Sequence, residues 1–389
     1  MQYSDVASLG ATPSLLGFGA MRLPLGPSGD PADVDVETTC RMVDTAIAGG
    51  VNYFDTAYAY HKEVSEGALR QALVERHDRG SFYLADKLAA FLCHNADEQT
   101  KMFETQLARC GVDYFDFYLI HAITEVRYEQ CQAFRTFDFM KELKESGRAK
   151  RIGFSFHGTP ELLSRVLDAH PEFEFVQLQI NYLDWRAQRA NEYYKIAHEH
   201  GLPILVMEPV KGGSLANLVP GAAALSPLLS TPAMQAAFAL KFAASLDGVM
   251  TVLSGMTTLE QVEVNVRTFQ DPSIRGFTEE DMRLAERVLE ETRKISQVPC
   301  TECGYCLDAC PVGIEIPKIF AIYNEFKRGG AAFHAQYLYS CIKEGHRADS
   351  CIKCGACVEK CPQGIDIPTE LEALHPEIPL LSLVPKGTK

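Results

Sequence analysis

Short apolar runs alternate with amphipathic segments from about residue 15 to residue 270. The amphipathic segments show helical patterns, and two of them carry signals for a helix end. VETTCRMVDTAIAGG (36–50) finishes at a glycine pair typical of a helix C-terminus, and PELLSRVLDAH (160–170) opens with proline, which suits the first helical position. The chain is therefore predicted to alternate strands with helices, the strands falling at 15–20, 51–57, 81–87, 116–121, 151–156, 173–180, 203–209 and 248–255.

Eight strands joined by helices predict an α/β fold, and their number favours a closed (β/α)8 TIM barrel. A doubly wound parallel sheet would give a similar alternation and stays open as the alternative. In a barrel, the groups that do chemistry lie at the C-terminal ends of the strands.

Five runs end in, or contain, a polar residue that could serve a site: Asp55, Lys87, His121, Ser155 and Gln177. Each has an ordinary structural explanation, since an aspartate can cap the next helix, a lysine can reach solvent and a histidine can pack in the core. Together they fall on one rim of the expected barrel. The set therefore predicts an active site there.

The segment DTAYAY (55–60), followed by Lys87 in LADKL and His121 in DFYLIH, resembles the aldo-keto reductases over residues 10 to about 270. The resemblance implies that Asp55, Tyr60, Lys87 and His121 form a catalytic tetrad. A tyrosine with a pKa near ~10 is a poor acid at neutral pH, and a nearby ammonium lowers that pKa. Tyr60 is then expected to protonate a substrate carbonyl that His121 orients, with Asp55 holding Lys87.

The same resemblance implies residues that bind a nicotinamide ring. Ser155 and Gln177 match the positions that hold the carboxamide, whereas Phe156 stands where the family usually has asparagine. Met207 stands where a tyrosine commonly stacks on the ring. The ring contacts are thus only partly retained.

The contacts to the adenosine part of the cofactor also depart from the family pattern. Asn265 matches an asparagine that contacts adenine, but Gly255 and Gln261 replace a lysine and an arginine that grip the 2′-phosphate of NADP. We therefore expect little preference for NADPH over NADH if a nicotinamide is used at all.

The segment VKGGSL offers a second way to bind a phosphate. Gly212 and Gly213 could let the backbone approach a pyrophosphate or a flavin phosphate, with Lys211 alongside, although a glycine pair is also common in ordinary turns. The cofactor of the barrel therefore stays open between NAD(P)H and a flavin.

Two cysteine runs near the C-terminus share the pattern C-x2-C-x2-C-x3-C-P. This spacing is typical of bacterial ferredoxins with two [4Fe–4S] clusters; structural zinc is the alternative, but it usually takes paired C-x2-C knuckles. The eight predicted ligands are Cys300, Cys303, Cys306, Cys310, Cys351, Cys354, Cys357 and Cys361.

The resemblance to two-cluster ferredoxins implies a crossed ligand pattern, in which the fourth cysteine of each run binds the other cluster. The interval between the runs reads as helical and is similar to helical two-cluster domains of respiratory reductases. We predict a barrel domain at 1–295 and a ferredoxin-like domain at 296–389. Five further cysteines are expected to be small core residues: Cys40, Cys93, Cys110, Cys131 and Cys341.

The charge and composition limit the partners and the compartment. A net charge of −14 over 389 residues argues against nucleic acid or an anionic membrane surface. The N-terminus MQYSDVASLG has no signal-peptide pattern and no apolar run could span a bilayer, so a cytoplasmic location is expected.

Three functions fit these predictions. The leading one is an oxidoreductase of aldo-keto reductase type that acts on a small carbonyl or alcohol and exchanges electrons, through its clusters, with a carrier protein such as ferredoxin. The second is an NAD(P)H-dependent carbonyl reductase with structural or redox-sensing clusters. The third is a regulatory or interaction protein, against which the complete tetrad argues. The substrate cannot be named from the sequence.

Overall fold

The computed structural model describes most of the chain and divides it into two compact units. The first unit comprises Met1–Asn181, Ala190–Pro209 and Ala237–Phe277, and the second comprises Tyr182–Arg189, Val210–Ala236 and Thr278–Lys389. The residues described are 1–187, 189–294, 297–300, 304–327, 332–361, 363–378 and 380.

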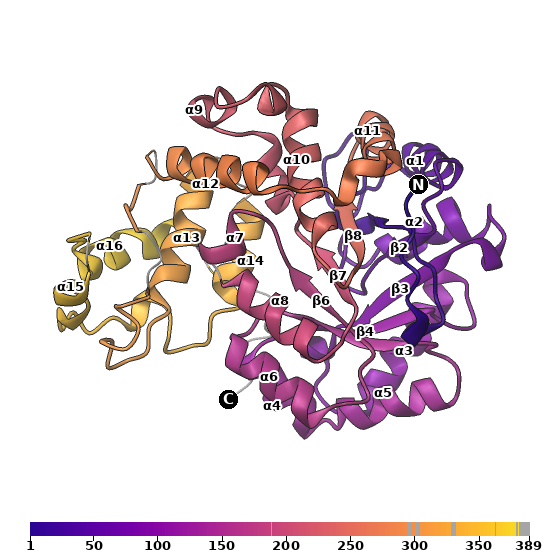
Figure 1. The fold of residues 1–389 in the computed structure, drawn as a ribbon. Coiled ribbons are helices and arrows are strands. Elements are labelled where there is room, and N and C mark those ends of the chain that lie inside the picture. Colours follow the sequence, from indigo (N-terminus) through magenta and orange to yellow (C-terminus); the bar gives the residue numbers. More distant parts are fainter. Residues whose placement is uncertain are drawn as a thin grey trace. The chain divides into compact units, whose positions relative to one another are not determined.

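The first unit is built on a closed barrel of eight parallel strands (Figure 1). Neighbouring strands follow chain order, and β1 pairs in parallel with β8, which closes the ring. This pairing confirms the TIM barrel and rules out the doubly wound sheet. Every strand overlaps one of the predicted runs: β1 Leu16–Gly19, β2 Tyr53–Asp55, β3 Tyr83–Leu88, β4 Phe117–Ile123, β5 Ile152–Phe156, β6 Phe175–Gln179, β7 Ile204–Met207 and β8 Val249–Gly255.

An aromatic layer fills the barrel at the start of its strands. Tyr53, Phe117 and Phe175 are the first residues of β2, β4 and β6, and all three are fully buried. The ring centroids of Tyr53 and Phe117 lie 5.0 Å apart, and those of Phe117 and Phe175 lie 5.2 Å apart. Layers contributed by alternate strands are how such barrels pack their interior. The polar residues at the strand ends therefore lie at the opposite mouth.

Capping residues mark where helices between the strands begin. The side chain of Asp35 accepts a hydrogen bond from the Thr38 amide at the start of α1, and that of Thr159 does the same for α6, whose first residue is Pro160. Both helices were predicted, α1 from the glycine pair at its end and α6 from Pro160 at its start. The helices of this part of the chain are α1 Val36–Ala48, α2 Ser65–Leu69, α3 Asp97–Cys110, α4 Glu125–Ala133, α5 Thr136–Glu145, α6 Pro160–Ala169, α8 Ala190–Glu199, α10 Pro232–Ser245 and α11 Leu259–Gln270.

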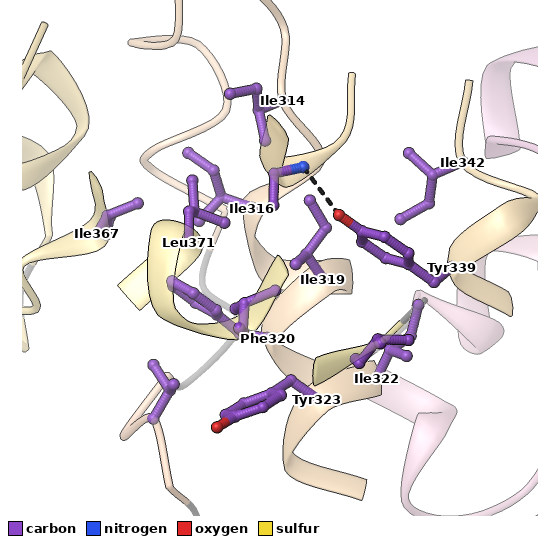
Figure 2. Close-up of a cluster of buried hydrophobic side chains, with 14 of the residues drawn as sticks. Ile314, Ile316, Ile319, Phe320, Ile322, Tyr323, Tyr339, Ile342, Ile367 and Leu371 are labelled. Atoms are coloured by element: carbon purple, nitrogen blue, oxygen red, sulfur yellow. Dashed lines mark hydrogen bonds between the residues drawn. The ribbon is translucent and has the colours of Figure 1, made fainter. Parts of the chain in front are cut away.

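The second unit is helical around its own hydrophobic core (Figure 2). Ile316, Ile319 and Phe320 of α13 pack there with Tyr339 of α14 and Leu371 of α16. The helical interval between the cysteine runs is thus confirmed. The helices of this unit are α7 Asp184–Ala187, α9 Pro220–Ala223, α12 Glu279–Arg293, α13 Ile316–Lys327, α14 Ala332–Ser340, α15 Ala356–Lys360 and α16 Ile367–Leu374.

The compact units do not follow the predicted domain ranges 1–295 and 296–389. Helix α12 groups with the second unit, as do the segments 182–189 and 210–236 from the loops after β6 and β7. The boundary near residue 295, between the barrel sequence and the ferredoxin-like sequence, stays a prediction. In the part of the chain that the structure describes, no helix combines the length and apolar character that crossing a bilayer needs.

Candidate active site and cysteine clusters

Asp55 and Lys87 form a buried ion pair at the barrel mouth. Asp55 closes β2 and Lys87 lies in the neighbouring β3, so both side chains reach the same interior. The Lys87 Nζ atom donates to Asp55 Oδ1 at 2.5 Å and to the Thr56 carbonyl at 2.7 Å. With their side chains only 1% and 3% exposed, Lys87 and Asp55 hold one another in a fixed geometry.

Tyr60 and His121 complete the group. The Lys87 Nζ atom lies 4.9 Å from the centroid of the Tyr60 ring, and the rings of Tyr60 and His121 meet edge to face with centroids 5.8 Å apart. Directly after Tyr60 the backbone takes three positive φ angles, at His61, Lys62 and Glu63. The structure thus brings all four residues of the predicted tetrad together.

The turn after Tyr60 is tied to the N-terminal part of the barrel. The His61 Nε2 atom accepts a hydrogen bond from the Leu23 amide at 3.0 Å, and its Nδ1 atom lies 2.9 Å from the Pro31 carbonyl. Lys62 forms an ion pair with Asp30 at 2.9 Å. Non-glycine residues keep positive φ angles only where their surroundings enforce them. These contacts therefore fix the loop that presents Tyr60.

The pKa of Tyr60 differs in direction from the prediction. Burial raises the pKa of Tyr60 well above its usual value, and the negative charges of Asp55 and Glu208 raise it further. We expected Lys87 to lower it, but the Lys87 ammonium is directed at Asp55 and the Thr56 carbonyl. Tyr60 is consequently a neutral phenol. Its hydroxyl can donate a hydrogen bond, but it does not readily ionise.

His121 is a neutral imidazole in this environment. Burial lowers the pKa of His121 well below its usual value, and the positive charges of Lys87 and Arg127 lower it further. Its Nδ1 atom is buried without a hydrogen-bond partner among the described residues. A buried polar atom without a partner is costly, so it marks a place where a bound molecule would fit.

On the cofactor side, Gln177 shows the same feature. Its Oε1 atom is buried and has no hydrogen-bond partner among the described residues, and Gln177 pairs in register with Ser155 of the adjacent strand. The Ser155 Oγ atom accepts a hydrogen bond from the Ala122 amide, near the end of β4, at 2.7 Å. One of its hydrogen-bonding positions is therefore already occupied. Gln177 is free to accept from a carboxamide, which fits a nicotinamide.

The other predicted cofactor-side residues lie in β7, where the nicotinamide ring was expected to stack, and in β8 and α11, where the adenosine part was expected to bind. Met207 ends β7, and the Asn265 Nδ2 atom donates to Ser254 Oγ at 3.0 Å. Gly255 is exposed at the end of β8, where an added Cβ would lie 3.2 Å from Arg22 Cδ. Gln261 caps α11 in a capping box with Thr258, so its side chain is used within the helix.

The position of Lys211 corrects the prediction that it lies beside a phosphate. Its side chain is 6% exposed and its Nζ atom lies 2.6 Å from Asp184 Oδ1 and 3.1 Å from Glu325 Oε2. Burial opposes its charge, but the two carboxylates hold the pKa of Lys211 above its usual value. The ammonium is therefore already neutralised within the second unit. Gly212 and Gly213 follow with φ angles of 64° and 100°, as a turn requires.

The described cysteines surround two hollows in the second unit. Cys300, Cys306 and Cys361 line the first. Cys310, Cys351, Cys354 and Cys357 line the second. Cys310 of the first run thus lies with the second run, and Cys361 with the first. The described cysteines are grouped as the crossed pattern predicts.

Cys303, the remaining predicted ligand, lies outside the described residues. Burial raises the pKa of Cys357, and the neighbouring thiolates of Cys310, Cys351 and Cys354 raise it further, in keeping with four sulfurs around one space.

Comparison with known proteins identifies the barrel. The model of the aldo/keto reductase family matches residues 15–227, which is more than half of the chain. The chain belongs to the aldo/keto reductase family. The expected family is therefore confirmed.

Relatives of this aldo/keto reductase differ in how much of it they cover. L-galactose dehydrogenase of Arabidopsis thaliana is 24% identical over 312 residues, or 75% of this chain and 95% of that protein. An aldo-keto reductase of Mycobacterium sp. (strain JLS) is 37% identical over 134 residues, 34% of this chain and 46% of the relative.

Solved structures share the fold. The holo form of aldo-keto reductase AKR11C1 from Bacillus halodurans aligns with a TM-score of 0.59 and 24% identity, covering 74% of this chain and 96% of that one. An aldo-keto reductase from Klebsiella pneumoniae in complex with NADPH aligns with the same TM-score and coverage at 19% identity.

A second family model accounts for the cysteine runs. The 4Fe-4S dicluster domain matches residues 299–365, beyond the aldo/keto reductase match. The chain is thus an aldo/keto reductase-type oxidoreductase with a 4Fe-4S dicluster domain. The match to this domain is evidence for iron–sulfur clusters in the chain.

Three residues of the barrel site were not predicted from the sequence. Arg22 lies against Gly255, and Asp86 and Glu66 are fully buried behind Lys87. Asp86 stands in the apolar run SFYLADK directly before Lys87, and a charged residue inside a buried run is the signal that could have pointed to it. Arg22 and Glu66 carry no comparable signal.

Proposed function

We propose that the barrel interconverts a small carbonyl compound and its alcohol, with a nicotinamide as the hydride carrier. The observation that carries this proposal is the assembly of Asp55, Tyr60, Lys87 and His121 at one mouth of the barrel. Solved relatives of the same fold include one in complex with NADPH. The unpartnered Gln177 Oε1 atom supports a bound carboxamide.

Each residue has a role that its environment suits. His121, being neutral, donates a hydrogen bond to the carbonyl oxygen and orients it. Tyr60 donates a proton to the same oxygen, and its raised pKa keeps that proton available at neutral and mildly alkaline pH. Lys87, held by Asp55, lies with its Nζ atom 4.9 Å from the centroid of the Tyr60 ring, a cation–π contact that helps to position the ring. A bound reduced nicotinamide would supply the hydride to the carbonyl carbon.

We further propose one [4Fe–4S] cluster in each cysteine-lined hollow, exchanging electrons with a carrier protein such as ferredoxin. The second hollow reaches the surface. Cys354 is exposed, and Ile352 between the first two cysteines of the run is 65% exposed. An exposed cluster edge is what one-electron exchange between proteins needs, whereas a purely structural cluster needs no such edge.

Hydride transfer moves two electrons and each cluster moves one. A coupled reaction therefore requires a component that can exchange electrons two at a time with the nicotinamide and one at a time with the clusters, such as a flavin. Without one, the barrel works alone and the clusters are structural or redox-sensing, which is the second candidate. The third, a regulatory protein without chemistry, predicts no role for Tyr60.

One experiment separates these candidates. Protein purified without oxygen is analysed for extractable flavin and nicotinamide, and Tyr60→Phe is compared with Tyr58→Phe, a matched control two residues earlier. We expect carbonyl reduction by NAD(P)H that only Tyr60→Phe abolishes. Extracted flavin together with reduction by a one-electron donor would favour the coupled reaction. An unchanged Tyr60→Phe enzyme would refute the proposed chemistry.

A further inference from the structure

The carboxyl groups of Asp86 and Glu66 interact with each other, outside the tetrad. Asp86 precedes Lys87 in β3, and Glu66 lies in α2; the structure buries both completely. The Asp86 Oδ1 atom accepts a hydrogen bond from the Lys87 amide at 2.8 Å, and the Asp86 Oδ2 atom lies 3.7 Å from the Cys110 thiol. The Asp86 carboxyl group is therefore hydrogen-bonded to the backbone amide of Lys87.

The positive charge near this pair does not balance two carboxylates. Arg109 donates to Glu66 Oε2 at 3.1 Å, and it also donates to the more exposed Glu63 at 2.7 Å. The other Glu66 oxygen, Oε1, is buried with no hydrogen-bond partner among the described residues. Two ionised carboxylates in one buried site repel each other strongly, and such sites usually hold one proton between them.

We propose that Asp86 and Glu66 share one proton, and that this neutralised pair is a positioning element that keeps a second negative charge away from Tyr60. A proton on Asp86 would supply a hydrogen-bond donor to the Glu66 carboxylate, one oxygen of which has no partner among the described residues. The proposal goes beyond the function stated above, and its effect on catalysis rests on that function.

The surroundings favour the shared proton. Burial raises the pKa of Asp86 well above its usual value, and the charge of Glu66 raises it further, while Lys87 opposes the change. Burial also raises the pKa of Glu66, against the opposing effect of Arg109. The other titratable groups that face the pair are the buried thiol of Cys110 and the buried phenol of Tyr118.

The pair also connects to the active site through the Lys87 peptide. Gln106 donates to the Lys87 carbonyl at 3.0 Å and accepts from Tyr118 at 2.6 Å, so both polar groups of that peptide are held from behind the strand. A charge on Asp86 raises the pKa of Tyr60 and so weakens it as an acid. While the proton is shared, Tyr60 is spared this effect.

Infrared difference spectroscopy tests the shared proton directly. A protonated carboxylic acid has a carbonyl stretch that a carboxylate lacks, so the spectrum of the complete wild-type protein minus that of Asp86→Asn at neutral pH should contain this band. Asp116→Asn serves as the control, because Asp116 is paired with Arg79 and should contribute only carboxylate bands. Absence of the acid band from the Asp86→Asn difference overturns the proposal.

A second variant protects the test against misfolding of the first. In Glu66→Gln the acid band should move or vanish, because an amide replaces the carboxylate that shares the proton. An unchanged band in a folded Glu66→Gln protein would mean that Glu66 takes no part.

The effect on catalysis has its own readout, the pH dependence of kcat. In the wild type kcat should fall at alkaline pH as the pair loses its proton, and this fall should be at least about threefold smaller in Asp86→Asn. Identical pH profiles would overturn the positioning role. If no carbonyl is reduced at all, the proposed function fails, and the infrared band still decides whether the pair shares a proton.

Discussion

Replacing Lys211 with methionine distinguishes the ion cluster seen in the structure from the phosphate site that its sequence suggested. The substitution leaves Asp184 and Glu325, whose side chains are 3% and 9% exposed, without the ammonium that lies 2.6 and 3.1 Å from them. At an effective dielectric constant of about 20, charges about 3 Å apart attract each other by about 5 kcal/mol, and the carboxylates repel each other by about half as much.

The expected cost follows from these values. Desolvation of the ammonium offsets several kcal/mol of its two attractions, which leaves roughly 3–5 kcal/mol, the usual cost of removing one partner from a buried ion pair. With a denaturant dependence of about 2–3 kcal/mol per molar urea, the unfolding midpoint should fall by about 1–2 M. The assay is anaerobic urea unfolding of the complete protein followed by circular dichroism.

Glu325→Gln is the matched control. It leaves Lys211 facing only Asp184, so the buried charges balance and the midpoint should move by less than about 0.5 M. The KM for NADPH should stay within about twofold of wild type in both variants, because Lys211 contacts carboxylates rather than cofactor. A KM raised tenfold or more in Lys211→Met with an unchanged midpoint would refute this reasoning and restore the phosphate site.

Three further outcomes can be measured. Tyr60→Phe should reduce kcat for carbonyl reduction by about 10²-fold or more, and a loss below threefold with rate-limiting chemistry would exclude it as the acid. Because burial keeps His121 neutral, wild type should lose stability below about pH 6.5 by up to about 1.4 kcal/mol per pH unit more than His121→Gln; parallel pH curves in urea unfolding would contradict this. Cys310→Ser should alter the paramagnetic signal that Cys354→Ser alters and leave the other signal intact, with iron falling from about eight towards about four per chain; an effect on the other signal alone would contradict the crossed grouping.

The barrel could be predicted because its strands are continuous apolar runs that end in polar residues. Parallel strands buried on both faces have continuous apolar sequences. The residues at their C-terminal ends lie at the same mouth of the barrel, whatever the lengths of the loops between them. Asp55, Lys87 and His121 were predicted in this way, and Tyr60 was predicted from the resemblance of DTAYAY to the aldo-keto reductases.

The parts that escaped prediction depend on contacts between residues far apart in the chain. Lys211 looked available because its two carboxylate partners lie 27 and 114 positions away. The sign of the pKa shift of Tyr60 could not be foreseen either, since burial outweighs the neighbouring ammonium only once the ring is enclosed. Local patterns specify elements and motifs, whereas burial and charge balance are set by the assembled core.

The grouping of segments 182–189 and 210–236 with residues 278–389 bears on how the gene can be divided. Asp184 and Lys211 belong to the loops that follow β6 and β7, yet the third member of their ion cluster, Glu325, is encoded after the first cysteine run. A gene shortened at codon 295 would remove Glu325 together with the hydrophobic core around α13. Recombination that exchanged the cysteine module for that of another reductase would therefore have to bring matching loops with it, so the two halves are expected to be inherited as a unit.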